Sequence, residues 1–355
     1  MLNNRISVAR ECLEEVGVDL LLVTNLSNIR YLTGFTGSEG TLILSREDAW
    51  FLTDSRYTSQ AGSEVTGAKV IEFKIKLDSI SAVFQQAGAK SVAFEAGTLT
   101  VQIYHELADR NPDLEFIPAD QKLLSLRSVK DEDELEILER VATIASESLL
   151  EILPLVKPGA LEKDVAWALE VAMRNRGADG KSFDFIVASG PRGALPHGKA
   201  SDKEIAAGEL VTLDYGALFR GYCSDETVTV AVGGPDSRQR EVYETVLEAQ
   251  RLAIEGARPG MNLKDIDALA RNYIASRGYG EYFGHGLGHG VGIDIHEYPP
   301  VSPRSVHTIE KGVVFTVEPG IYIPGWGGVR IEDTVVMEQS GCRRLTKVPK
   351  ALMVL

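Results

Sequence analysis

The chain has 355 residues, of which 44% are hydrophobic and 25% are charged, so it can bury sizeable cores as an ordinary globular protein does. Its net charge of −14 argues against binding to a nucleic-acid backbone or to an anionic membrane, because both need a basic face. The amino terminus lacks the apolar core of a signal peptide, and no apolar run has the length of a membrane span.

The first third of the chain alternates between helical and strand patterns. Its predicted elements are a helix over residues 4–16, a strand in the apolar run 18–25, a hairpin over 40–45 and 49–54, and a strand over 91–95. Together these elements predict a small α/β unit.

The chain changes character over residues 126–153, which open polar and continue as an amphipathic helix. The length of the chain also favours two domains. We therefore expect an amino-terminal domain over residues 1–127 and a second domain over residues 128–355.

The second domain contains an internal repeat. Residues 157–178 align without gaps onto residues 258–279, and each copy reads as a Pro-Gly turn, an amphipathic helix and a closing glycine. The identical pairs are Pro158/Pro259, Gly159/Gly260, Lys163/Lys264, Asp164/Asp265, Arg176/Arg277 and Gly177/Gly278. A predicted strand hairpin follows each copy, so we expect two α+β halves related by a pseudo-twofold axis.

The two hairpins carry acids in matching positions, Asp214 and Asp225 in the first, Glu318 and Glu332 in the second. A pseudo-twofold would bring the four carboxylates together, and like charges ~4 Å apart repel by several kcal/mol in a medium of moderate dielectric. Either most of them are protonated or cations lie among them, and two divalent cations would neutralise all four. Arg330 points to the same strand face as Glu332, where it either orients an acid or forms an ordinary salt bridge.

Histidines are concentrated in one glycine-rich segment. His285, His289 and His296 lie in or just after residues 284–292, where alternate glycines argue against a regular helix. Carboxylates with one imidazole suit Mn²⁺ or Co²⁺ better than a thiolate zinc site does. The other histidines, with His197, would remain available for proton transfer and oxyanion contacts.

At these residues the chain resembles the metal-dependent proline peptidases of the pita-bread fold, the Xaa-Pro aminopeptidases and Xaa-Pro dipeptidases. Residues 285–297, HGLGHGVGIDIHE, match the signature of that family. Residues 28–40 and 51–61 resemble its creatinase-type amino-terminal domain, and residues 126–138 resemble its interdomain segment. The resemblance implies an α+β pita-bread catalytic domain with an internal pseudo-twofold, preceded by a smaller α/β domain. One position departs, because Val228 stands where relatives often carry arginine.

Carried over residue by residue, the resemblance implies five ligands for two divalent metal ions. They are Asp214, Asp225, His289, Glu318 and Glu332. Asp225 and Glu332 would bridge the ions, and a hydroxide shared between the ions would attack the carbonyl that precedes proline.

The resemblance also implies roles for the remaining groups. Glu318 would act as the general base, and His285 and His296 would stabilise the oxyanion or bind substrate. His197 matches a family histidine near the substrate. The implied substrate is a peptide with proline in second position, and the implied assembly is a homodimer.

Other functions on this fold remain as alternatives. Methionine aminopeptidases share the five ligands but usually lack the amino-terminal domain. Creatinases share both domains but not the ligands, and pita-bread binding modules have typically lost ligands. The sequence does not separate a dipeptidase from an aminopeptidase.

The ligand types and the cysteines give expectations for the bound ion and the cellular compartment. Mn²⁺ is the expected metal, and Co²⁺ or Zn²⁺ also suits such ligands. Three scattered cysteines, Cys12, Cys223 and Cys342, have no C-x-x-C spacing and read as reduced core residues, which favours the cytoplasm.

Overall fold

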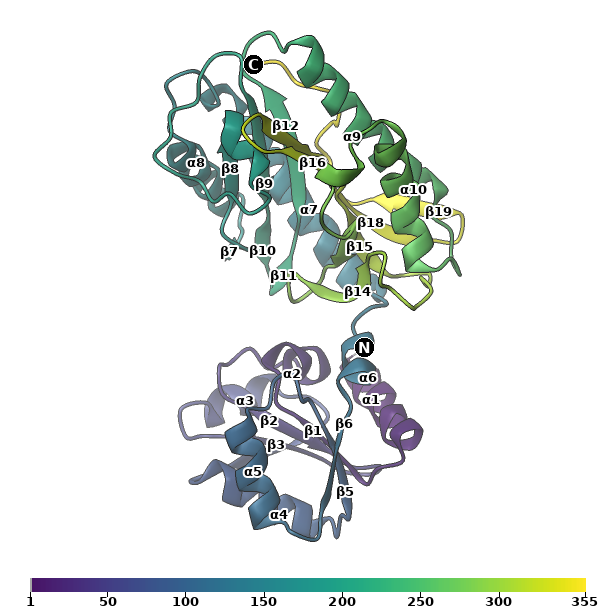
Figure 1. Ribbon diagram of the computed structural model, residues 1–355. Helices are drawn as coiled ribbons and strands as arrows, with labels where there is room; N and C mark the ends of the chain where they lie inside the picture. Colours follow the sequence, from purple (N-terminus) through teal and green to yellow (C-terminus); the bar gives the residue numbers. More distant parts are fainter. Residues whose placement is uncertain (1) are drawn as a thin grey trace. The chain divides into compact units, whose positions relative to one another are not determined.

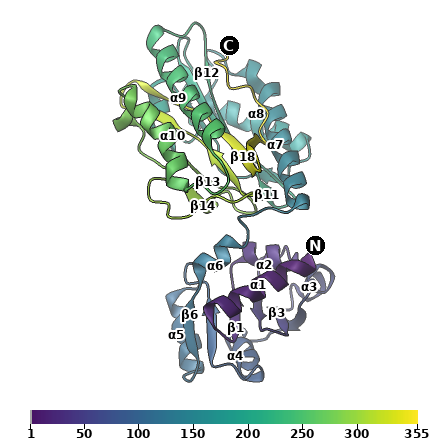
Figure 2. The same ribbon diagram turned by 90° about the vertical axis from the view of Figure 1, so that its right-hand side faces the viewer.

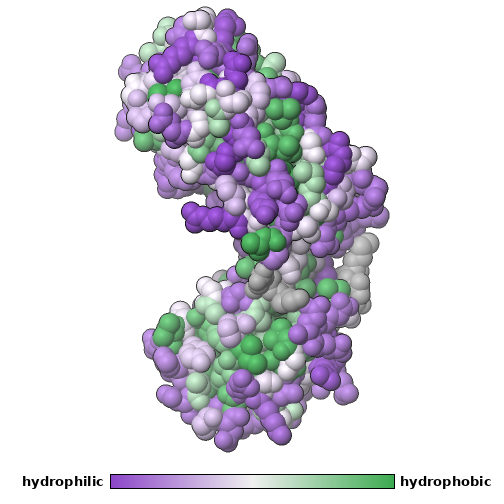
Figure 3. All heavy atoms as spheres, turned by 45° about the vertical axis from the view of Figure 1, so that its right-hand side comes forward, coloured by the Kyte–Doolittle hydropathy of each residue, from purple (hydrophilic) through white to green (hydrophobic). Residues whose placement is uncertain are grey.

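A computed structural model describes residues 2–355, and the side chains of residues 2–4, 121 and 122 lie outside this description. The chain forms two compact units, Met1–Arg127 and Ser128–Leu355, each a mixture of helices and strands (Figure 1). On the face drawn in Figure 3, hydrophilic residues cover most of each unit and hydrophobic residues gather in smaller patches. None of the helices in the described part of the chain has both the length and the apolar character that crossing a membrane requires.

The amino-terminal unit is a six-stranded mixed sheet with the strand order β4-β3-β2-β1-β5-β6. Its strands are β1 (Leu20–Val23), β2 (Thr41–Leu44), β3 (Ala49–Thr53), β4 (Lys69–Glu72), β5 (Ser91–Phe94) and β6 (Glu115–Pro118). Its helices are α1 (Leu2–Val16), α2 (Leu26–Thr33), α3 (Thr58–Glu64), α4 (Lys76–Gln86), α5 (Val101–Arg110) and α6 (Asp120–Ser125). The predicted hairpin is confirmed, since β2 and β3 pair antiparallel.

Burial explains why this sheet is covered by helices. Every residue of β1, β2 and β3 is buried, as happens when both faces of a sheet are packed. On one face, Leu20 and Leu22 of β1 belong to an apolar cluster with Ile80 and Phe84 of α4. The unit therefore has a core of its own.

The carboxy-terminal unit begins with two helices and a group of short strands. These elements are α7 (Glu132–Ile152), the 3₁₀ turn η1 (Leu153–Leu155), α8 (Glu162–Asn175), β7 (Gly180–Lys181), β8 (Ile186–Ser189), the turn η2 (Gly190–Ala194), β9 (Leu210–Tyr215), β10 (Ala217–Phe219), β11 (Tyr222–Cys223) and β12 (Glu226–Ala231). Strands β12, β9 and β8 form one antiparallel sheet in that order.

A second half follows in the same order. Its elements are α9 (Ser237–Gly256), α10 (Leu263–Ser276), the turn η3 (Gly280–Tyr282), β13 (Gly288–Gly290), β14 (Glu297–Val301), β15 (Val314–Val317), β16 (Gly320–Ile323), β17 (Gly327–Arg330), β18 (Asp333–Glu338) and β19 (Gly341–Arg344). The sheet order here is β14-β13-β15-β18-β19, and β16 pairs with β17.

The predicted repeat is confirmed element by element. Helices α8 and α10 have 14 residues each and occupy equivalent positions of the aligned segments. The turns before them use Gly159 and Gly260 with φ of 84° and 85°, a backbone conformation that glycine adopts without steric cost. Helices α7 and α9 both begin with a capping box, at Asp131 and Asp236.

Two apolar clusters form the core of this unit, each centred on the helix pair of one half. One cluster joins α7 and α8 to β9 and β12, and the other joins α9 and α10 to β15 and β18. Figure 2 shows the two helix pairs on the outside with the strands between them. The halves meet where Thr227 of the first bridges to Glu332 of the second, with a hydrogen bond of 3.1 Å from the Glu332 amide to the Thr227 carbonyl.

Candidate metal centre

A cavity of about 780 Å³ opens among the strands of the carboxy-terminal unit. All nine residues that the sequence singled out line it, and they come from both halves. They are His197, Asp214, Asp225, His285, His289, His296, Glu318, Arg330 and Glu332. The structure thus brings together the whole predicted set, whose individual roles remain predictions.

Strand register and two close approaches set the positions of the ligand candidates. Asp214 pairs with Thr227 across β9 and β12, and Thr227 bridges to Glu332, so side chains of this row lie on one face of the sheet. A side chain at Gly216 would meet the Ser224 carbonyl oxygen at 1.9 Å, so the turn between the two aspartates needs glycine.

The second hairpin is held in the same manner. A Cβ atom at Gly288 would lie 2.0 Å from the Thr316 carbonyl oxygen, so glycine lets β13 approach β15. This approach places His289 beside Glu318, whose Oε1 lies 3.3 Å from the histidine Nε2. The glycine-rich segment is therefore a means of close strand packing, and its three-residue strand confirms the expectation that it forms no regular helix.

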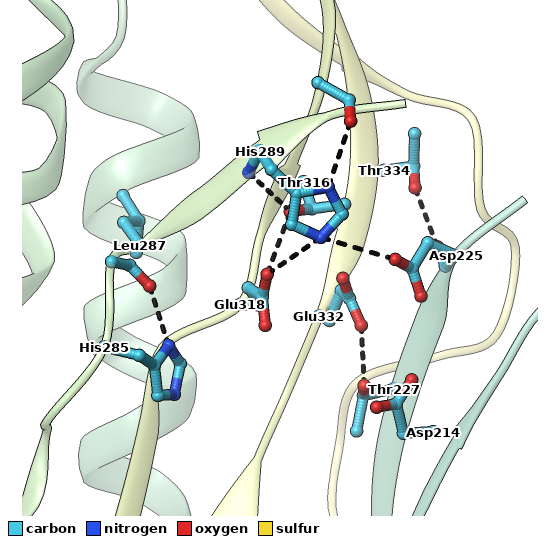
Figure 4. Close-up of polar contacts among 12 residues, drawn as sticks. Asp214, Asp225, Thr227, His285, Leu287, His289, Thr316, Glu318, Glu332 and Thr334 are labelled. Carbon is cyan, nitrogen blue, oxygen red and sulfur yellow. Dashed lines mark hydrogen bonds and ion pairs between the residues drawn. The ribbon is translucent and has the colours of Figure 1, made fainter. Parts of the chain in front are cut away.

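Three ligand candidates form the centre of the cluster. Asp225, His289 and Glu332 each offer one ligand atom, and these atoms all lie within 4.8 Å of one another. Figure 4 shows His289 between Glu318 and Asp225, with Glu332 next to them and Asp214 near Thr227. Nδ1 of His289 lies 3.0 Å from the Gly290 carbonyl and, since a carbonyl only accepts, carries a proton. Its other nitrogen, Nε2, points at the carboxylates and is therefore the atom that can bind a cation.

The electrostatics of the acids favour a cation. Burial raises the pKa of Asp225 well above its usual range, and the charges of Glu332 and Asp214 raise it further. Burial does the same to the pKa of Glu332, and Glu318 adds to the shift. Buried carboxylates that resist ionisation are stabilised in their charged form by positive charge placed among them. The donor set, oxygen-rich with one imidazole, fits divalent metal ions.

Glu318 behaves differently from the other acids. Burial alone would raise its pKa, but the hydrogen bond and charge of His289, together with the charges of His285 and Arg330, lower the pKa to about 2. The effect is mutual, since Glu318 overcomes the burial of His289 and raises the imidazole pKa. Glu318 is therefore the acid most readily held as a carboxylate, the form that accepts a proton.

Arg330 is bound to the cluster by several contacts. Its Nη2 donates to Asp214 Oδ2 at 2.5 Å, its Nε donates to Thr227 Oγ1 at 3.3 Å, and its side chain is 4% exposed. Nη1 donates to the Tyr322 hydroxyl at 2.8 Å and to the Pro196 carbonyl at 3.2 Å. This geometry favours the orienting role over the ordinary salt bridge.

The other histidines line the cavity in different surroundings. His285 lies apart from the carboxylates in Figure 4, with Nδ1 2.7 Å from the Gly286 carbonyl and Nε2 3.0 Å from the Tyr322 hydroxyl. The His296 ring lies 4.3 Å from the His289 ring, centroid to centroid. Burial, followed by the charge of His289, lowers the pKa of His296, so its neutral form is favoured. His197 is exposed at the cavity wall.

The sequence matches Metallopeptidase family M24 over residues 136–339 and the Creatinase/Prolidase N-terminal domain over residues 5–129. The chain belongs to metallopeptidase family M24. The expected pita-bread architecture behind a creatinase-type domain is thereby confirmed. Because M24 is a family of divalent-metal hydrolases, the acidic cluster is a candidate metal centre on grounds independent of its geometry.

Relatives match over almost the full length. An Xaa-Pro dipeptidase of Pyrococcus horikoshii is 39% identical over 353 residues, which cover 99% of each chain. The structure of an Xaa-Pro dipeptidase from Bacillus anthracis is 43% identical with a TM-score of 0.97, and 100% of each chain is covered. An X-Pro aminopeptidase from Thermotoga maritima is 38% identical with a TM-score of 0.91 and 99% coverage of each chain. Both types of proline peptidase are thus similar to this M24 chain.

The position that departs from the family pattern lies outside the cavity. Val228 is 2% exposed and packs in the apolar core of the first half. Because side chains alternate along a strand, its neighbour Thr227 faces the M24 site and Val228 faces the helices. Valine at this position therefore leaves the ligand cluster unchanged.

Two features of the M24 site were missed from the sequence. The first is Tyr322, whose hydroxyl joins Arg330 to His285. The second is a buried ion cluster behind the ligands, where Lys350 Nζ lies 2.7 Å from Glu226 Oε1 and 3.4 Å from Asp333 Oδ1. The signal for the second was available, because Glu226 and Asp333 each adjoin a ligand candidate and must point to the opposite face of the strand.

Proposed function

We propose that this protein is a metal-dependent hydrolase of the Xaa-Pro bond in dipeptides or at the amino terminus of peptides. The observation that carries the proposal is the cluster of Asp225, His289 and Glu332, buried to half-buried, at the wall of a cavity large enough for a short peptide. The two kinds of proline peptidase among the similar structures support the substrate class.

The ligands we propose are five, for two divalent ions: Asp214, Asp225, His289, Glu318 and Glu332. Their oxygen-rich chemistry and the raised pKa values of Asp225 and Glu332 support this set. Divalent ions held there would lower the pKa of a water molecule and polarise the substrate carbonyl. Arg330 would keep Asp214 in position through its hydrogen bond of 2.5 Å.

The residues around the ligands would move the protons and hold the substrate. Glu318, held as a carboxylate, would accept a proton from water and pass it to the proline nitrogen, which becomes a secondary amine when the bond breaks. His296, kept neutral by its surroundings, would donate an N–H hydrogen bond to the developing oxyanion. His197 and His285 would contact the substrate from the cavity wall.

The state of His285 refines its proposed role. Because Nδ1 donates to the Gly286 carbonyl, Nε2 accepts the hydrogen bond from Tyr322 in this arrangement. Burial lowers the pKa of His285 and so favours the neutral ring. A substrate contact through Nε2 would therefore have to replace the contact with Tyr322.

One assay tests the proposed function. The protein is stripped with a chelator, reloaded with Mn²⁺ and offered Ala-Pro, Ala-Pro-Ala and Met-Ala, with mass spectrometry following each peptide. We expect metal-dependent loss of a proline peptide and no loss of Met-Ala. Cleavage of Met-Ala alone would favour a methionine aminopeptidase, and no cleavage in any condition would favour a peptide-binding module.

We further propose Mn²⁺ as the bound ion, with Co²⁺ and Zn²⁺ as alternatives, together with a homodimer in the cytoplasm. The hard and borderline donors of the cluster support Mn²⁺. Elemental analysis of protein purified without added metal tests the ion. Light scattering during size-exclusion chromatography tests the dimer, and fractionation of cells tests the location.

A further inference from the structure

One row of residues crosses the sheet that forms the cavity wall. Lys199 bridges to Ile186, Ile186 pairs with Asp214, and Asp214 pairs with Thr227, which bridges to Glu332. Directly opposed residues on neighbouring strands point to the same face of a sheet. Lys199 and Ile186 therefore face the cavity together with Asp214 and Glu332, and both line it.

The same row of residues determines how far Lys199 lies from the ligand candidate Asp214. Neighbouring strands lie about 4.8 Å apart, so the backbones of Lys199 and Asp214 are separated by roughly 10 Å, with Ile186 between them. In an Xaa-Pro dipeptide, the terminal carboxylate carbon is three bonds, roughly 3 Å, from the carbonyl carbon that is attacked. A lysine side chain that leans across Ile186 covers the remaining length.

Lys199 belongs to a group of three charged side chains, and this group leaves its ammonium available to an anionic ligand. Asp184 Oδ2 accepts from Lys199 Nζ at 2.6 Å, and Asp184 Oδ1 accepts from Lys181 Nζ at 2.8 Å. One carboxylate serves two ammonium groups, so the trio carries an excess positive charge. If Lys199 turns to an anionic ligand, Asp184 keeps Lys181 as its partner. The hydrogen bonds from Lys181 and Lys199 lower the pKa of Asp184 to about 2, so it stays charged.

The second positively charged side chain of the cavity, Arg330, is already held by other residues. Among the described residues that line it, Lys199 and Arg330 carry the ammonium and guanidinium charges. Arg330 is buried against Asp214, Thr227 and Tyr322. Lys199 is instead 71% exposed, while Lys181 is not a lining residue. Lys199 is thus the lysine that a substrate can reach.

We propose that Lys199 binds the free α-carboxylate of an Xaa-Pro dipeptide, while Ile186 forms the apolar floor beneath the proline ring. The inference rests on the proposed proline-peptidase function and narrows it to substrates whose proline is carboxy-terminal. The amide of a longer peptide carries no charge at that position, so it gains no ion pair with Lys199. The site therefore prefers dipeptides to longer chains.

The test removes the charge first from the substrate and then from the protein. Ala-Pro and its neutral analogue Ala-Pro-amide are hydrolysed by the Mn²⁺-loaded wild type and by Lys199→Met, which keeps the length of the side chain. Lys199→Arg retains the charge, and Lys181→Met, which removes the other partner of Asp184, is the matched control. Metal content and melting temperature are measured for each variant.

We expect a loss of kcat/KM only for the combination of Lys199→Met with Ala-Pro. Hydrogen bonds to charged groups contribute enough for Lys199→Met to lower kcat/KM for Ala-Pro by roughly ten- to a hundredfold, mainly through KM. For Ala-Pro-amide the change stays within about twofold, because the ion pair is absent from the start. Lys199→Arg retains the preference for the carboxylate, and Lys181→Met resembles the wild type.

Other outcomes overturn the inference. An equal loss on both substrates would assign Lys199 a structural role, and no loss on either would leave the carboxylate to another group. A wild type that cleaves Ala-Pro-amide as well as Ala-Pro would also refute it while the proposed function stands. Failure of the wild type to cleave any proline peptide would instead refute the function itself.

Discussion

Asp225→Asn should have opposite effects on stability without and with metal. The substitution keeps the shape of a side chain that is 7% exposed and removes its charge. Its ligand atom lies within 4.8 Å of that of Glu332, and at this distance two unit charges repel by about 3 kcal/mol in an effective dielectric of about 20. Protonation of Asp225, whose pKa burial raises, already relieves part of that energy. The metal-free variant should therefore gain up to about 3 kcal/mol of unfolding free energy.

With metal the sign reverses. A ligand that binds only the folded state stabilises it by about 4 kcal/mol when its concentration is a thousand times its Kd. The variant has lost the charge of one of the proposed ligands, so it forgoes most of this stabilisation and the activity with it. The melting temperature of the wild type should then rise with metal far more than that of the variant.

Thermal unfolding followed by circular dichroism, in chelator and in Mn²⁺, measures both effects. In a unit of this size 1 kcal/mol corresponds to about 2–4 °C, so a difference of several degrees is expected in each direction. Asp202→Asn, which alters a carboxylate 84% exposed, is the control and should shift the midpoint by about a degree at most. A metal-free Asp225→Asn protein less stable than the wild type would refute the reasoning from crowded carboxylates.

Three further results are expected. Lys350→Met should lower the unfolding free energy by about 3 kcal/mol or more in urea titrations, because it leaves the buried Glu226 carboxylate without its cation, whereas Asp333 keeps Arg344. Tyr322→Phe should lower kcat by roughly tenfold with unchanged metal content, because His285 loses its hydrogen-bond partner. The metal-free wild type should lose stability as pH rises above about 4, because Asp225 and Glu332 have raised pKa values and hold protons that the unfolded chain releases; denaturant titrations at several pH values measure this slope.

Matched variants separate these effects from general damage. Lys163→Met removes the partner of Asp202, a lysine whose side chain is 52% exposed, and should leave the unfolding free energy near the wild-type value. A similar loss in Lys163→Met and Lys350→Met would contradict the assignment of a buried ion cluster. Tyr282→Phe alters another tyrosine of the cavity and should leave kcat near the wild-type value. If both tyrosine variants slow the reaction equally, the contact between Tyr322 and His285 has no special role. Stability of the metal-free protein that stays level from pH 4 to 8 would contradict the raised pKa values.

Local patterns in the sequence predicted much of this molecule. The aligned helices α8 and α10 and the strand hairpins follow from turn residues and from apolar periodicity, both of which are local. The candidate ligands could be grouped because the repeat predicts a pseudo-twofold axis. Equivalent positions of the two halves, although distant in the sequence, lie close together around such an axis. The structure confirms that Asp225 and Glu332 lie together.

What the sequence did not show depends on contacts between distant segments. Lys350 and Glu226 are 124 positions apart, and no periodic pattern connects the carboxy-terminal segment to β12. The row from Lys199 to Asp214 likewise arises from one isolated bridge outside the regular strands. Tyr322 sits in an apolar strand where its hydroxyl could not be distinguished from ordinary packing until Arg330 was placed beside it.

The joined hairpins have the symmetry of a dimer within one chain. Thr227 Oγ1 donates to Glu332 at 2.6 Å, and its counterpart Thr334 donates to the Asp225 carbonyl at 2.7 Å, so each half secures the other at equivalent points. One half alone provides only two of the four acids. Two identical half-length polypeptides around a twofold axis would provide all four, since an isologous contact presents every residue twice. The arrangement is that of a twofold dimer joined into one chain, in which one half supplies two aspartates and the other supplies two glutamates and a histidine.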